Sequence, residues 1–257
     1  MKIRISLWWV IFLPFMILSH MGKTLFFLFL MLSIHEAAHM MVARYFHYPI
    51  RSLIIYPFGL CAQMQYIGMG CVWKELLIVA VGPLTHLCFP YFFVLLQSCH
   101  LLSAAYMEYL CYLNTSILIF NLLPIYPLDG GRLLQSFYHL CFRYRTAQRL
   151  TYITGIINLY LLFHYHIITS ASAYLVMGFL LFQIVMCWKN LAYERIVFYH
   201  YRLAHPPNGR IRANRKDDLF RAYTNMMKTE QGWMLEDEWL LTYFQEEPLC
   251  RLRQIVL

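Results

Sequence analysis

The chain has 257 residues, of which 60% are hydrophobic, 18% are aromatic and only 13% are charged. This composition, with a mean hydropathy of +0.51, excludes an ordinary soluble domain and indicates a polytopic membrane protein. The net charge is +8, but the basic residues flank apolar runs, as they do in cytoplasmic loops. No basic stripe is interleaved with aromatic residues, so we expect no nucleic-acid partner. The eight cysteines form no CxxC pair, which argues against a zinc ribbon or a redox motif.

Six apolar runs predict six transmembrane helices. Basic residues gather in the loops that this count places inside the cell, so both termini are predicted to be cytoplasmic. The expected fold class is an all-α polytopic membrane protein with six transmembrane helices, a membrane-associated β-hairpin and a small cytoplasmic C-terminal domain. The predicted spans cover residues 5–18, 24–46, 73–97, 108–123, 151–168 and 173–188.

The second span contains the sequence HEAAH at residues 35–39. Residues four apart lie on one face of a helix, so His35 and His39 can bind one metal ion. Glu36 lies between them, where it can act as a general base on a water molecule. Ionisable groups inside a membrane span are expensive and are by default functional. The alternative is that each histidine hydrogen-bonds to a backbone carbonyl.

A catalytic zinc ion usually takes three protein ligands and keeps one position open. The acidic side chains of residues 1–189 are few, and those at the ends of predicted spans are unsuited to a buried site. Asp129 follows the fourth span in the sequence LDGG and is the acid that remains beside Glu36. It is therefore the predicted third ligand, although an aspartate before two glycines can also simply cap a turn.

Between the second and third spans, β-branched residues precede Pro57-Phe58-Gly59, and an alternating stretch follows from Cys61 to Tyr66, which places a hairpin over residues 54–65. This pattern predicts a β-hairpin, with an ordinary cytoplasmic loop as the alternative. A hairpin at membrane depth is allowed where protein or a cavity satisfies its backbone. The third span contains GPLTH, whose His86 is either a core histidine or a side chain pointing toward the metal site.

After residue 190 the chain becomes rich in both basic and acidic residues. We expect a membrane domain over residues 1–190, a linker over 191–209 that contains HPPNG, and a small cytoplasmic domain over 210–257. Residues 215–228 have helical character and residues 232–241 alternate weakly. About fifty residues are marginal for an independent hydrophobic core, so we expect this domain to pack against another part of the protein or against another copy of it.

HEAAH in the second span, GPLTH in the third and NLLPIYPLDGGR after the fourth together resemble the signatures of the site-2 protease family of intramembrane zinc metalloproteases (peptidase family M50). The resemblance covers roughly residues 25–135. It implies one Zn²⁺ per chain on His35, His39 and Asp129, with Glu36 as the general acid and base. It also implies substrate contacts from the hairpin and from the loop motif, namely Ile54, Ile55, Tyr56, Pro57, Phe58, Gly59, Asn121 and Pro124.

Within the family, six spans and a short tail resemble the branch of sporulation proteases. The resemblance implies a membrane-associated protein substrate, the pro-sequence of the sporulation sigma factor pro-sigma-K, together with membrane regulatory or inhibitory proteins and a homo-oligomer. It implies a multi-pass protein in the bacterial cell membrane or the outer forespore membrane. That branch carries a nucleotide-binding CBS module where this tail stands, so ATP is a ligand to consider, although the tail shows no clear CBS pattern.

Two other classes of function stay open. The first is a catalytically inactive membrane scaffold of the same family, and bound zinc would discriminate against it. The second is a metal or proton transporter that uses the same ligands. A transporter should show internal repeats and polar residues in several spans, and neither pattern is visible in this sequence.

Overall fold

A computed structural model describes residues 2–7, 10, 14, 22–56, 59–165, 170–207, 209–230 and 232–246. The first predicted span lies largely outside these residues. The chain divides into two compact units, which are described here one at a time. The first unit comprises residues 1–67, 73–123 and 128–130, and the second comprises residues 68–72, 124–127 and 131–257.

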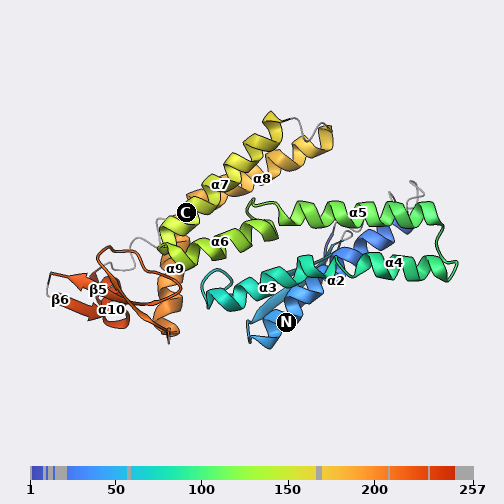
Figure 1. Ribbon diagram of the computed structural model, residues 1–257. Helices are drawn as coiled ribbons and strands as arrows, with labels where there is room; N and C mark the ends of the chain where they lie inside the picture. The colour runs from blue at the N-terminus through green and yellow to red at the C-terminus, as the bar shows by residue number, and fades with distance from the viewer. Residues whose placement is uncertain are drawn as a thin grey trace. The chain divides into compact units, whose positions relative to one another are not determined.

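The first unit is built on α2 (Gly22–Tyr45), α3 (Val72–Thr85), α4 (Phe89–Ser98) and α5 (Ala104–Leu122). Helices α4 and α5 lie side by side (Figure 1). The connection ends at Ser103, whose hydroxyl caps α5 by accepting from the backbone N–H of Tyr106. The buried side chains of Met31, Phe89, Phe93 and Leu110 join these helices into one apolar core.

A three-stranded sheet packs on α2 in the same unit. Strands β2 (Ile50–Tyr56) and β3 (Gly59–Met64) form the antiparallel hairpin that the alternating sequence predicts. Strand β1 (Lys2–Ile5) pairs in parallel with β2, so β2 is the central strand. The sequence pattern does not reveal this strand, and the first span is predicted to begin at Ile5, because apolar residues near a basic N-terminus suit a helix equally well.

Gly59 allows β3 to approach α2 closely. Its φ of +140° is a conformation that residues with side chains rarely adopt. A Cβ atom at this position would also lie 2.9 Å from Cβ of Leu32 on α2. The glycine therefore fixes the distance between the hairpin and the helix that carries HEAAH.

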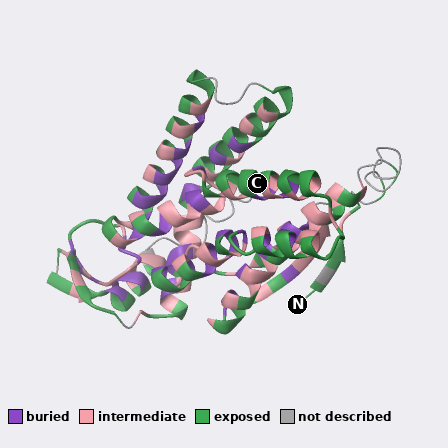
Figure 2. Cartoon of the chain, turned by 45° about the vertical axis from the view of Figure 1, so that its right-hand side comes forward, coloured by how far each residue is buried: buried purple, intermediate pink, exposed green. Residues whose placement is uncertain are grey.

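The second unit contains α6 (Asp129–Cys141) from Gly131 onward, together with α7 (Tyr144–His164), α8 (Ala171–Lys189) and α9 (Leu191–Ala204). Helices α7 and α8 run side by side (Figure 1), and much of their outer surface is exposed (Figure 2). On α8 the exposed surface is apolar: Leu175, Phe179 and Phe182 are 78%, 57% and 58% exposed. Such a face suits contact with lipid.

The C-terminal part of the second unit contains β4 (Ile211–Asn214), β5 (Thr224–Thr229), β6 (Gly232–Leu235) and α10 (Glu236–Glu246). Strand β4 pairs in parallel with β5, and β5 pairs antiparallel with β6. The expected helix over residues 215–228 is wrong, because Asn225 and Met227 alternate toward the core, as strand residues do.

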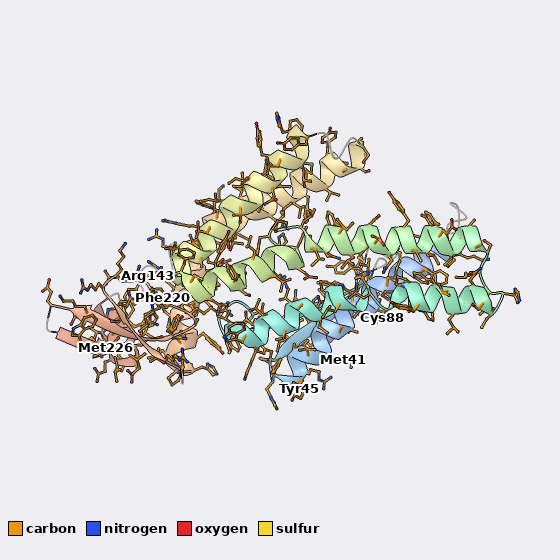
Figure 3. All side chains as sticks on the ribbon, viewed as in Figure 1. Met41, Tyr45, Cys88, Arg143, Phe220 and Met226 are labelled. Atoms are coloured by element: carbon orange, nitrogen blue, oxygen red, sulfur yellow. The ribbon has the colours of Figure 1, made fainter. Side chains whose placement is uncertain are left out.

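Helix α9 occupies most of the segment that we expect to be a linker. Its Phe198 and Tyr199 pack into the core of the C-terminal sheet, together with Leu219, Met227 and Leu240. Arg202 of α9 makes a buried ion pair with Glu236, with a Nε–Oε1 distance of 2.6 Å. Arg143 at the start of α7 stacks on Phe220, with its guanidinium 4.9 Å from the ring centroid (Figure 3). The small domain is therefore held to α7 and α9 by specific contacts.

Three segments of the described chain are long and apolar enough to cross a membrane by length and composition. They are α2, the stretch Val72–Ser98 that comprises α3 and α4, and α8. These three match the second, third and sixth predicted spans. Helices α5 and α7 occupy the positions of the fourth and fifth predicted spans, and the topology of six spans stays a prediction.

Candidate metal centre

Three side chains of the first unit converge on one point. Nε2 of His35 lies 2.9 Å from Oδ2 of Asp129, and Nε2 of His39 lies 3.4 Å from the same oxygen. The two Nε2 atoms are 3.0 Å apart. Two ligands of one tetrahedral zinc ion are about 3.3 Å apart, so this arrangement fits a zinc ion with only small adjustments. His35, His39 and Asp129 form a possible metal-binding group of the described chain.

The two histidines are one helical turn apart on the buried face of α2, and each is only 6% exposed. Nδ1 of His39 lies 2.7 Å from the carbonyl oxygen of Ile78 on α3, to which it donates a hydrogen bond. This contact leaves Nε2 of His39 free to act as a ligand, which is the usual arrangement around a metal-bound imidazole.

Gly82 of α3 explains how that helix comes so close. A Cβ atom on Gly82 would lie 2.2 Å from Nε2 of His39 and 2.8 Å from Nε2 of His35. The missing side chain therefore leaves the space in which the imidazoles meet. GPLTH is visible as a motif in the sequence, but nothing in the sequence indicates this role of its glycine.

Asp129 is the first residue of α6, and the glycine after it brings it to this point. A Cβ atom on Gly130 would lie 2.1 Å from the carbonyl oxygen of Leu122 at the end of α5, so only glycine fits there. Oδ2 of Asp129 is buried and accepts no hydrogen bond of ordinary geometry among the described residues. A buried carboxylate oxygen without such a partner, facing two imidazole nitrogens, fits the donor set of a zinc site.

Glu36 lies on α2 beside the cluster and is oriented by the hairpin. Its Oε1 accepts a hydrogen bond of 2.9 Å from the backbone N–H of Ala62 in β3. In an edge strand, every second backbone N–H points away from the neighbouring strand, and the N–H of Ala62 is one of these. The edge of β3 therefore faces the carboxylate that is predicted to act as the base.

The residues predicted to bind substrate fall in several places. Ile54, Ile55 and Tyr56 lie in the central strand β2, and Ile54 and Ile55 pair with both β1 and β3. Gly59 opens β3, whereas Pro57 and Phe58 lie outside the described residues. Asn121 lies in the last turn of α5. Pro124 follows in a loop that belongs to the second unit.

Comparison with known proteins agrees with these motifs. The family model of peptidase family M50 matches residues 97–164, which include Asp129. The chain is 31% identical over 148 residues to stage IV sporulation protein FB of Bacillus subtilis (strain 168), covering 58% of this chain. Both similarities agree with the resemblance to the site-2 protease family that the sequence motifs show. The chain spans about half of the length of that curated relative, 51%.

The fold of this chain resembles that of a solved site-2 protease. It superposes on the site-2 protease from Methanocaldococcus jannaschii with a TM-score of 0.53 and 23% identity, covering 72% of this chain and 91% of the other. The long apolar helices, together with the similarity to a membrane protease family, support a membrane protein. The resemblance seen in the sequence is thus confirmed at the level of family and fold.

Proposed function

We propose that this chain is an intramembrane zinc metalloendopeptidase of peptidase family M50. The observation that carries the proposal is the convergence of His35 and His39 of α2 with Asp129, about 90 residues later in the chain, beside Glu36. Turn capping alone would not require Asp129 to be buried against two imidazoles. One Zn²⁺ per chain on these three ligands would lower the pKa of a bound water toward neutral and polarise a peptide carbonyl.

Each residue of the site would then have a separate role. His35, His39 and Asp129 would hold the ion. Glu36 takes the proton from the attacking water and delivers it to the leaving amine. Ala62 holds the Glu36 carboxylate through its N–H, so that the base has one orientation before substrate arrives.

The substrate would bind as an added strand. A peptide bond within a helix is shielded by its neighbours, so the cleavage site must be extended. Strand β2 is already paired on both sides, whereas the outer edge of β3 pairs with no strand of the described chain. We place the substrate on this edge, because it leads to Glu36. Ile54, Ile55, Tyr56, Pro57, Phe58, Gly59, Asn121 and Pro124 stay proposed substrate contacts, either through side chains or by shaping that edge.

The proposed substrate is a membrane-associated protein cleaved near the cytoplasmic side. Similarity to a sporulation protein supports the pro-sequence of pro-sigma-K as its identity. The same similarity supports membrane regulatory partners and a location in the cell membrane or the outer forespore membrane. The six-span topology with cytoplasmic termini, a homo-oligomer and ATP binding by the C-terminal domain belong to the same proposal.

Zinc content and cleavage, measured together, test the proposal. The wild-type chain is purified without chelators, and cleavage of a coexpressed pro-sigma-K-type substrate is followed. We expect about one zinc per chain, loss of zinc and cleavage in Asp129→Ala, and loss of cleavage alone in Glu36→Gln. Asp217→Ala changes an exposed acid and is the matched control.

A wild-type chain that lacks both zinc and cleavage would support an inactive scaffold of the same family. If Asp129→Ala kept the zinc content and the cleavage activity of the wild type, Asp129 would be a turn residue and not a zinc ligand. Normal cleavage by Glu36→Gln would remove the proposed base.

A further inference from the structure

A second buried pair of polar side chains lies next to the metal centre. His86, in the break between α3 and α4, is 1% exposed, and Asn114 of α5 is 2% exposed. Nδ1 of His86 lies 2.7 Å from Oδ1 of Asn114. Nδ2 of Asn114 donates a hydrogen bond of 2.9 Å to the carbonyl oxygen of His86. The two residues thus clamp each other through two hydrogen bonds.

This clamp fixes the tautomer of His86. The amide nitrogen of Asn114 is used on the carbonyl oxygen, so the atom that faces Nδ1 is the amide oxygen, which can only accept. Nδ1 of His86 must therefore carry a hydrogen. In a neutral ring, Nε2 then has a lone pair and acts as an acceptor. Nε2 of His86 is buried and has no hydrogen-bond partner among the described residues.

The neighbouring imidazole ring, that of His35, needs a hydrogen-bond acceptor for its Nδ1 hydrogen. His35 directs Nε2 toward Asp129 and His39, so its hydrogen is on Nδ1 when Nε2 is a metal ligand. Nδ1 of His35 is also buried without a partner in the described part of the chain. The ring centroids of His35 and His86 are 5.2 Å apart, a spacing that accommodates a hydrogen bond of about 3 Å between two ring nitrogens.

The two histidine ligands therefore differ in how they are supported. His39 already donates from Nδ1 to the Ile78 carbonyl. His35 has no backbone acceptor of this kind among its described contacts, and His86 is the ring beside it. Metal-bound histidines nearly always donate their second N–H to a fixed acceptor, and loss of that acceptor weakens metal binding.

We propose that His86 is a positioning residue of the metal centre: clamped by Asn114 with its hydrogen on Nδ1, it accepts a hydrogen bond from Nδ1 of His35 and thereby sets the orientation of that ligand. This proposal rests on the proposed zinc site. It assigns a use to the histidine of GPLTH and to Asn114, a buried polar residue of α5.

Metal affinity tests the proposal without relying on cleavage. The full-length chain in detergent is stripped and titrated with Zn²⁺ against a chelator, and the visible absorption of the Co²⁺-loaded protein is recorded. We expect His86→Phe to weaken Zn²⁺ binding by roughly 10- to 100-fold and to shift the Co²⁺ absorption. His86→Gln can still donate to Asn114 and accept from His35, so it should recover part of the affinity.

Two further variants separate positioning from simple stability. Asn114→Leu leaves His86 in place but releases its tautomer, and we expect it to weaken Zn²⁺ binding as well. Asn114→Leu also serves as the test of the proposal if His86→Phe does not fold. His139→Phe removes another fully buried histidine, in the second unit, and should keep wild-type Zn²⁺ affinity even where it lowers the melting temperature.

The outcomes distinguish this proposal from the proposed function. Zinc in the wild type with unchanged affinity and Co²⁺ absorption in both His86→Phe and Asn114→Leu would overturn the positioning role alone and leave His86 as a core residue. A wild-type chain that binds no zinc would overturn the protease and, with it, the positioning role.

Discussion

The backbone N–H of Ala62 donates a hydrogen bond of 2.9 Å to Oε1 of Glu36, which joins the edge of the hairpin to the helix that carries HEAAH. This bond places the proposed general base and the proposed substrate-pairing edge in one rigid arrangement. The hairpin and the helix approach closely enough to make it because Gly59 packs against Leu32.

Ala62→Pro tests this bond. Proline removes the N–H, and the position tolerates it because the N–H of Ala62 points away from β2. We expect kcat for cleavage to fall on the order of tenfold, since the base loses its fixed orientation, while zinc content stays at the wild-type level. Ala62→Val retains the N–H and should keep near-normal kcat. Equal activity in the proline and valine variants would show that the bond does not orient Glu36.

Gly82→Ala tests the closeness of α3 to the imidazoles. The added methyl group would lie 2.2 Å from Nε2 of His39, a ring that its bond to Ile78 prevents from turning away. We expect zinc affinity to fall by roughly 100-fold or more. Gly178 of α8 has no atom within 4 Å of an added Cβ, so Gly178→Ala is the matched control. Wild-type zinc affinity in Gly82→Ala would mean that α3 stands farther from the site.

The pH dependence of stability should carry a contribution from Glu194. Burial raises the pKa of Glu194 to about 7 from 4.5, although the Tyr152 hydroxyl donates a hydrogen bond that favours the charged form. The folded chain therefore keeps this proton at pH values where the unfolded chain releases it. Its stabilising contribution is complete below about pH 4.5 and is lost as the pH rises to about 7.

Thermal unfolding in detergent at pH 5 and pH 8 checks this expectation. Glu194→Gln should be more stable than the wild type at pH 8 by roughly 1 to 2 kcal/mol, and the difference should shrink at pH 5. Glu230→Gln, at an exposed acid, should leave the pH dependence unchanged. The same pH dependence in Glu194→Gln and the wild type would contradict the assignment.

The buried ion pair between Arg202 and Glu236 should stabilise the second unit. Arg202 also donates to the backbone oxygens of Arg221 and Tyr223, so its removal leaves several acceptors and a buried carboxylate without their donor. We expect Arg202→Ala to lower the free energy of unfolding by about 3 to 5 kcal/mol.

Replacing both partners, with Arg202→Met and Glu236→Leu, should restore part of the loss from Arg202→Ala, because no unpaired charge is then buried. Arg215→Ala changes an exposed arginine and is the control. A loss below about 1 kcal/mol in Arg202→Ala would show that the pair behaves like a surface salt bridge.

The sequence by itself determined the helix that carries the metal ligands, because the four-residue spacing of His35 and His39 is a local property of α2. It also determined the hairpin, since strand alternation and the turn at Pro57-Phe58-Gly59 are local signals. The scarcity of acids in the apolar region pointed to Asp129. These inferences needed no knowledge of distant contacts.

Only the tertiary structure decided which distant groups complete the site. Strand β1 joins the sheet, Ala62 reaches Glu36 and Gly82 admits the imidazoles through packing between segments that are far apart in the sequence. The pairing of His86 with Asn114 depends in the same way on how α5 packs against the break after α3. Local periodicity carries no information about such contacts, because they depend on close approach of backbones and on the single orientation that each buried polar group can satisfy.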